Sequence, residues 1–167
     1  MNDAHLHMLV NHFPIIGTIF GVGILIAGAI FKNNSVKNTA YILFVITSFF
    51  GFASMSTGEG AEEIAEKLPS VSHKIIHEHE EIAEKLALFL YVLGTISLIG
   101  LYLNIKKHAK ANFVTYIAIG FGFSVIYLAQ KTGTTGGEIR HTEIRENATG
   151  NVDSAQEIGE EHHEENH

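Results

Sequence analysis

Hydrophobic residues are gathered in four continuous runs, and polar residues fill the segments between them. The runs cover residues 13–31, 39–56, 86–104 and 113–130, and none contains Asp, Glu, Lys, Arg or His. Each is long enough to cross about 30 Å of hydrocarbon as a helix. The runs are continuous rather than alternating, which favours helices over strands. The sequence therefore predicts an all-α fold, a four-transmembrane-helix bundle.

The connection between the second and third runs also has a helical pattern. Apolar residues recur at helical spacing beyond the second run until Pro69 interrupts them. A second helix is predicted to begin near Val71 and to continue into the third run. On it His79 falls on the apolar face, whereas His73 and His77 fall on the opposite face. The pattern predicts an extramembrane helical connection between spans two and three.

The remainder of the chain divides into one membrane domain and a polar tail. Residues 1–145 form the predicted four-helix domain, and residues 146–167 are acidic and rich in histidine. A segment of that composition is expected to be disordered. Just after the fourth run, Gly133, Gly136 and Gly137 predict a turn that brings the chain back toward the bundle.

Lysines mark one side of the predicted membrane protein. The short loops 32–38 and 104–112 contain lysine and no acidic residue, so the positive-inside rule places both in the cytoplasm. The N-terminus, the connection between runs two and three, and the tail are then outside. The sequence predicts a multi-pass protein of the cell inner (cytoplasmic) membrane, with the lipid bilayer as its partner.

Two features of the composition exclude classes of function. The formal net charge of −7 argues against nucleic acid as a partner. The chain has no cysteine, which excludes disulfides, thiolate metal sites, cysteine-ligated iron–sulfur clusters and thioether-attached haem. Histidine is abundant instead, with 11 residues.

Small residues recur within the predicted spans. Gly17 and Gly21 are four residues apart in the first span, and Gly51, Ser54 and Gly58 follow a similar spacing at the end of the second. Such spacing is typical of closely packed transmembrane helices. The alternative is that the small residues leave room for a flat cofactor.

Ligand-type side chains gather at the outer ends of all four predicted helices. The candidate metal ligands are His7, His12, Glu59, Glu62, His79, Glu80 and His141. Imidazole suits iron, copper and zinc, and carboxylates add harder ligands. A helical bundle can build a metal site from one contribution per helix. The alternative is a hydrogen-bonded polar cap that closes the bundle.

Three motifs resemble a bacterial family of small four-span membrane proteins that is grouped as a domain of unknown function. They are LHMLVNHFPI at 6–15, TGEGAEE at 57–63 followed by HEE at 79–81, and GGEIRH at 136–141. Met8 departs from the family's pattern, which has proline there. The resemblance spans residues 7 to 143. It implies a four-span bundle and, because similar modules are joined to Rieske or cytochrome domains, a redox role.

These observations lead to one functional hypothesis with two alternatives. We expect an integral membrane redox or electron-transfer protein, with a respiratory or redox protein as its partner. Its centre is expected to be a b-type haem with two axial ligands from His12, His79 and His141, and Arg140 paired with a propionate. One alternative is a non-haem Fe, Cu or Zn site, mono- or dinuclear, that adds Glu59, Glu62 or Glu80. The other is a non-catalytic membrane subunit whose polar cap is structural. Enzymatic activity stays open.

Overall fold

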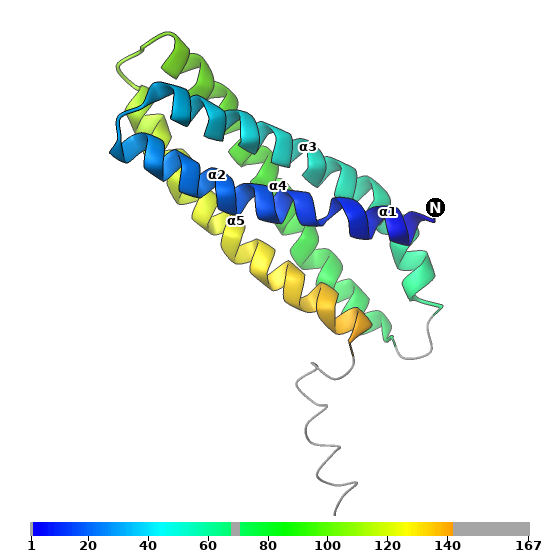
Figure 1. Cartoon of the computed structure of the whole chain (residues 1–167). Helices are drawn as coiled ribbons and strands as arrows, with labels where there is room; N and C mark the ends of the chain where they lie inside the picture. The colour runs from blue at the N-terminus through cyan, green and yellow to red at the C-terminus, as the bar shows by residue number, and fades with distance from the viewer. Residues whose placement is uncertain (1, 68–70, 142–167) are drawn as a thin grey trace, which may run out of the picture.

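The computed structural model describes residues 2–67 and 71–141, and all the regular structure in them is helical. The helices are α1 (Asp3–Val10), α2 (His12–Ile30), α3 (Asn34–Ala65), α4 (His73–Ile105) and α5 (Ala111–Arg140). α1 and α2 follow one another as a single rod, which packs with the other three helices into a bundle (Figure 1). Four segments are long and apolar enough to cross a membrane. The prediction of an all-α four-helix bundle is confirmed.

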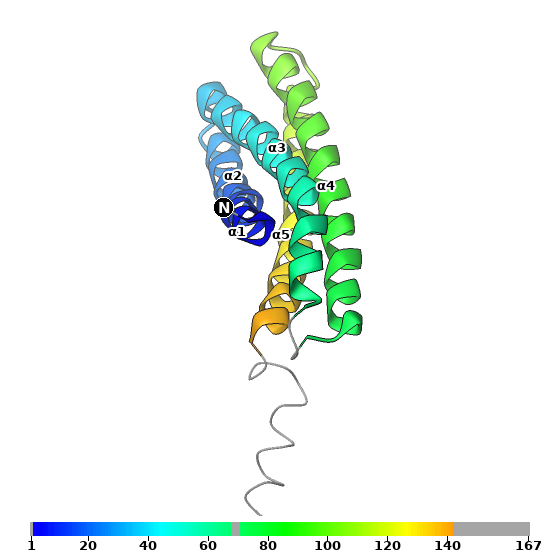
Figure 2. The same cartoon turned by 90° about the vertical axis from the view of Figure 1, so that its right-hand side faces the viewer.

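The two ends of the bundle differ in composition. The turns between α2 and α3 and between α4 and α5 lie at the same end in both views (Figures 1 and 2). We call this the lysine end, because the turns hold Lys32, Lys106 and Lys107. The opposite end contains α1, the last turns of α3 and α5, and the first turns of α4. We call it the histidine end, because His7 and His79 lie there.

The helices pack through stripes of residues spaced alternately by three and four. In α4 the buried stripe is Leu86, Leu90, Leu93, Ser97, Gly100 and Asn104. In α2 it is Pro14, Thr18, Gly21, Leu25 and Gly28. This mean spacing of about 3.5 residues is the repeat of helices that pack at shallow crossing angles. Continued toward the histidine end, the same steps reach His7 and Asn11 on the first rod and His79 on α4.

Small residues let neighbouring helices approach closely along these stripes. A Cβ added at Gly21 would lie 2.9 Å from the Cδ1 of Phe44, and one at Gly51 would lie 3.0 Å from the Cδ1 of Leu90. Gly100 faces Tyr41, whose hydroxyl shares a 2.9 Å hydrogen bond with Thr115. Neighbouring side chains fill the space at these glycines, so close packing is the interpretation that the structure supports.

The helices are longer than the membrane is thick. α4 has 33 residues, which is about 50 Å at 1.5 Å per residue, against about 30 Å of hydrocarbon. We therefore take the charge-free runs as the membrane-spanning segments. The ends of the helices that carry His7, Glu59, Glu62 and His79 extend beyond them.

The predicted turn after the fourth span is wrong. α5 continues through Gly133, Gly136 and Gly137 and ends at Arg140, and no glycine of the described residues has a positive φ. Within the helix Gly136 makes room for the ring of His79, and Gly133 faces open space. The interruption expected at Pro69 and the tail at 146–167 lie outside the described residues.

Candidate functional site

His7 lies on α1 and is held by the last membrane turn of α3. Its Nδ1 is 3.0 Å from the carbonyl oxygen of Ser54 and 3.2 Å from the Oγ1 of Thr57. The carbonyl oxygen can only accept, so Nδ1 carries the proton and donates it. Thr57 donates its own hydroxyl proton to a backbone carbonyl, which leaves its oxygen to accept. The Nε2 of His7 therefore carries a lone pair.

His79 lies on α4 and is held in the same way by α5. Its Nδ1 is 3.0 Å from the Oγ1 of Thr135, and that hydroxyl donates to the carbonyl oxygens of Lys131 and Thr132. Nδ1 is therefore the donor, and Nε2 carries the lone pair. Gly136 makes room for the ring, since a Cβ there would lie 2.9 Å from the His79 Cε1.

His7 lies close enough to His79 to affect the pKa of that imidazole. Burial is the main reason why the pKa of each is lowered, and the charge of His7 lowers the pKa of His79 further. Hydrogen bonds to backbone carbonyls, from His7 to Ser54 and from His79 to Thr132, oppose the shifts. Both imidazoles are thus neutral near neutral pH. Within residues 2–67 and 71–141 neither Nε2 has a hydrogen-bond partner.

Asn11 adds a third acceptor on the stripe of His7. The break between α1 and α2 falls at Asn11, because Pro14 has no N–H to bond the carbonyl of Val10. Asn11 is one helical turn from His7 and donates its backbone N–H to the His7 carbonyl oxygen at 3.0 Å. Its side-chain Oδ1 is buried and has no partner among the described residues. Such an atom is costly unless a donor or cation reaches it.

His12 lies on a different face from His7. It is exposed, and its Nδ1 is 2.9 Å from the carbonyl oxygen of Met8 on its own helix. It borders an apolar pocket of about 250 Å³ between α2 and α3. The other residues that line this pocket are Phe13, Ile16, Gly17, Leu43, Ile46, Thr47 and Phe50. The stripe spacing that points His7 into the bundle points His12 away from it.

The predicted carboxylate ligands form a separate group between α3 and α4. Burial and the charges of Glu80, Glu66 and Glu59 raise the pKa of Glu62, and the charge of His77 opposes the shift. Glu59, Glu66 and Glu80 thus lie near enough to Glu62 to affect its pKa. In the part of the chain that the structure describes, however, no three His, Asp or Glu side chains converge so that they could hold a metal ion.

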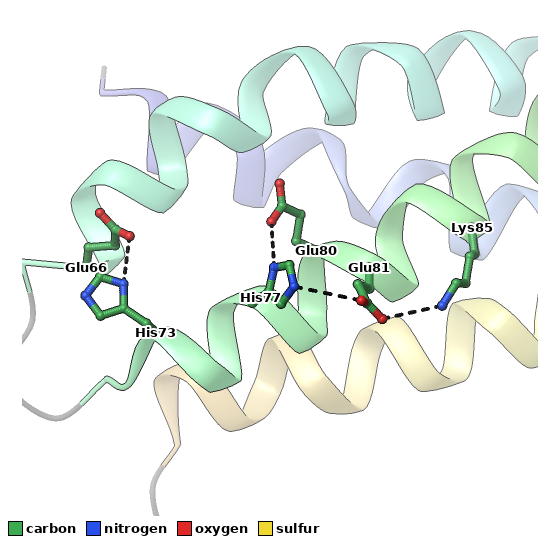
Figure 3. A network of polar contacts seen from close by, with 6 residues as sticks. All are labelled: Glu66, His73, His77, Glu80, Glu81 and Lys85. Atoms are coloured by element: carbon green, nitrogen blue, oxygen red, sulfur yellow. Dashed lines mark ion pairs between the residues drawn. The ribbon is translucent and has the colours of Figure 1, made fainter.

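The surface histidines of α4 form ion pairs with acids instead (Figure 3). His73 is 3.0 Å from Glu66, and its side chain is 85% exposed. His77 is 3.5 Å from Glu80 and 3.8 Å from Glu81, with a side chain that is 72% exposed. His79 is half-buried, as the helical spacing predicts, and these two face solvent.

The C-terminal candidates lie at the end of α5. His141 is exposed and follows the last residue of α5, Arg140; the side chain of Arg140 lies outside the described part of the chain. The sequence did not predict that Thr57 and Thr135 bond the two imidazoles or that Gly136 makes room for the His79 ring. Thr132, Thr135 and Gly136 fall at helical spacing on one face of the fourth helix, but this pattern does not show that the face meets His79.

Comparisons with known proteins gave no match for this chain. No protein-family model matches it, no characterised protein matches it, and no solved structure matches it. The resemblance of its three motifs to a family of four-span proteins therefore stays a prediction.

Proposed function

We propose that this chain is a membrane redox protein that holds a b-type haem through the Nε2 atoms of His7 and His79. One observation carries the proposal: His7 and His79, on different helices, lie near enough for His7 to affect the pKa of His79, and each ring has its Nδ1–H bound and its Nε2 unbound. Metal-ligating histidines have this arrangement, because a bond at Nδ1 fixes the ring and raises the basicity of Nε2.

The donor set fits haem better than the non-haem alternative. A bis-imidazole haem needs two protein ligands, and the described residues supply two inward histidines but no converging group of three ligands. Gly136 makes room for the ring of His79. A Cβ added at Gly58 would lie 3.8 Å from the Cε1 of His7. A haem held by His7 and His79 would supply single-electron transfer, and the two imidazoles would leave no ligand position for a substrate.

The role of each residue follows from this arrangement. His7 and His79 would bind the iron, and Ser54 and Thr135 would orient the rings. The apolar helices are consistent with a lipid bilayer. We place the histidine end outside the cytoplasmic membrane, where a redox partner would dock, because the lysine loops favour the cytoplasm.

The test is haem content. The protein is expressed in cells supplied with iron and haem precursor and purified in mild detergent, and a pyridine haemochrome assay is run beside metal analysis. We expect haem in the parent protein and its loss in His7→Ala and in His79→Ala. The doubly substituted His73→Ala, His77→Ala protein is the control and should keep it.

Other outcomes identify the alternatives. Zinc or copper without haem, lost on His79→Ala, would support a non-haem site. A colourless, metal-free protein would leave the histidine pair as a structural polar cap.

A further inference from the structure

A lysine is buried at the end of the bundle opposite the histidines. Lys37 is 4% exposed and is the one charged side chain buried among the described residues. Its stem packs against α2 at Gly28, where an added Cβ would lie 2.8 Å from the Lys37 Cγ. Lysine is rarely buried unless its charge is paired.

The partner of this ammonium group is neutral. The Nζ of Lys37 donates to the Oδ1 of Asn112 at 3.1 Å. No ion pair to Lys37 occurs in the described residues. Residues 4–58 and 85–137 contain no Asp or Glu, so no acid of either hairpin lies at this end of the bundle. An anion from outside the chain would balance the charge.

The hydrogen bond to Asn112 places the ammonium at the first turn of α5. That helix begins at Ala111, whose N–H donates to the carbonyl oxygen of His108, and no side chain caps the N–H groups of the rest of its first turn. The N-terminus of α3, by contrast, is capped by Asn33, whose Oδ1 accepts from Ser35 and Val36. An uncapped helix N-terminus has unbonded N–H groups and a partial positive charge, which attract phosphate and other oxyanions.

We propose that a phosphate group binds between the Lys37 ammonium and the first turn of α5. The two features are independent, and both supply hydrogen-bond donors and positive charge. Exposed Lys110 precedes Ala111 and adds a further cation. Lys37 lies two residues before the second apolar run, at the depth of lipid headgroups. The phosphate comes either from an anionic phospholipid or from free phosphate.

The experiment measures binding to the purified full chain in detergent. Native mass spectrometry gives the dissociation constants of phosphatidylglycerol and of phosphatidylcholine with the same acyl chains. We expect phosphatidylglycerol to bind at least about fivefold more tightly, since one lysine near a headgroup contributes about 1 kcal/mol. Displacement of the lipid by inorganic phosphate identifies the small anion as the ligand, and no displacement identifies the lipid. Equal binding of both lipids, with no displacement by phosphate, would overturn the proposal.

Three variants separate a binding role from a structural one. Lys37→Met keeps the stem and removes the charge, so the preference for phosphatidylglycerol should fall at least about fivefold. Lys106→Met removes an exposed lysine of the same end and should change the preference less than about twofold. Asn112→Ala removes the neutral partner and should keep the preference.

A purely structural lysine gives a different pattern. If Lys37 only ties α3 to α5, Asn112→Ala and Lys37→Met would lower the melting temperature alike, and neither would alter the ratio of the two lipids. If Lys37→Met does not fold, the dissociation constants of the two lipids can still be compared in the parent protein and in Asn112→Ala. That comparison still separates a binding role from a structural one.

Discussion

The two ends of this bundle bury opposite kinds of polar group. At the histidine end the atoms without partners are acceptors: the Nε2 atoms of His7 and His79 and the Oδ1 of Asn11. At the lysine end the corresponding groups are donors: the ammonium of Lys37, whose one partner among the described residues is the neutral Asn112, and the first turn of α5, which has no side-chain cap. Acceptors attract a metal or a proton, whereas donors attract an anion.

The same packing geometry produces both ends. The stripe spacing that buries Leu90 and Leu93 in the middle of α4 brings His79 inward at one end and Asn104 at the other. At the histidine end the inward groups come from α1 and α4 and are oriented by hydroxyls and carbonyls of α3 and α5. The residues at the last positions of this shared repeat therefore determine the chemistry of each end.

The largest effect is expected from a methyl group at the His79 ring. In Gly136→Ala the new Cβ would lie 2.9 Å from the His79 Cε1, so the ring must leave its bond to Thr135. Haem content should fall at least about tenfold, because a displaced ligand lowers affinity by one to two orders of magnitude.

Gly133→Ala is the matched control for this substitution. It lies on the same helix, and its added Cβ meets nothing within 4 Å. It should keep full haem content and be slightly more stable, since alanine favours a helix by about 1 kcal/mol over glycine. Equal haem content in both variants would contradict the placement of His79.

A corresponding substitution tests the lysine end. In Gly28→Ala the new Cβ would lie 2.9 Å from the backbone nitrogen of Lys37, and backbone cannot move aside as a side chain can. The free energy of unfolding should fall by about 1–3 kcal/mol, the usual cost of overpacking. Gly23→Ala faces open space and should not destabilise. Unfolding in mixed detergent would measure both, and a harmless Gly28→Ala would mean that α2 and α3 are farther apart at this end.

The cofactor-free protein should lose stability at its histidine end as the pH falls. The pKa values of His7 and His79 are lowered by burial, so the unfolded chain takes up protons that the folded chain does not. The stability that the two neutral histidines contribute is complete above their pKa of about 6.5 in the unfolded chain. It falls as the pH drops toward their lower pKa values in the folded protein. The melting temperature should therefore be lower at about pH 5.5 than at about pH 7.5.

Hydrogen exchange locates this effect within the bundle. Amides of α1 should exchange faster at the lower pH after correction for intrinsic rates, and those of the turn between α2 and α3 should not. His79→Gln should reduce the pH dependence of melting. Uniform acceleration along the chain would contradict the assignment to the histidine pair.

The smallest effect is expected at the carboxylates between α3 and α4. Glu62 has a raised pKa, from burial and from the charges of Glu80, Glu66 and Glu59. Glu62 is repelled by these neighbouring carboxylates when the pH is above its pKa in the folded protein. The repulsion is relieved as the pH falls through that pKa. Glu62→Gln should therefore stabilise the protein at neutral pH by roughly 0.3 kcal/mol, because these groups are largely solvated. Exposed Glu63→Gln is the control, and equal gains would show that no specific repulsion exists.

The fold could be predicted because the membrane imposes it. Four charge-free runs of sufficient length leave helices as the simplest structure that satisfies the backbone. Helical spacing also placed His79 inward and His73 and His77 outward. The turn predicted from Gly133, Gly136 and Gly137 is wrong, because glycine permits a turn but does not require one. Gly136 instead lies within α5 and makes room for the ring of His79.

The partners within the candidate site could not be predicted, because they depend on register between helices. Nothing along the chain shows that His7 reaches Ser54 or that His79 reaches Thr135, each about 50 residues away in sequence. His12 and His7 differ only in which face of the first rod they occupy. Lys37 was assigned to a loop, but α3 begins at Asn34 and its first turns bury the lysine.

The spin state of the bound iron tests the central claim most directly. Electron paramagnetic resonance of the ferric protein should show a low-spin centre with two imidazole ligands. His7→Ala and His79→Ala should each convert it to a high-spin signal or abolish it, while His12→Ala should leave it unchanged. A low-spin signal that survives loss of either His7 or His79 would contradict the account and return the axial ligands to the exposed histidines.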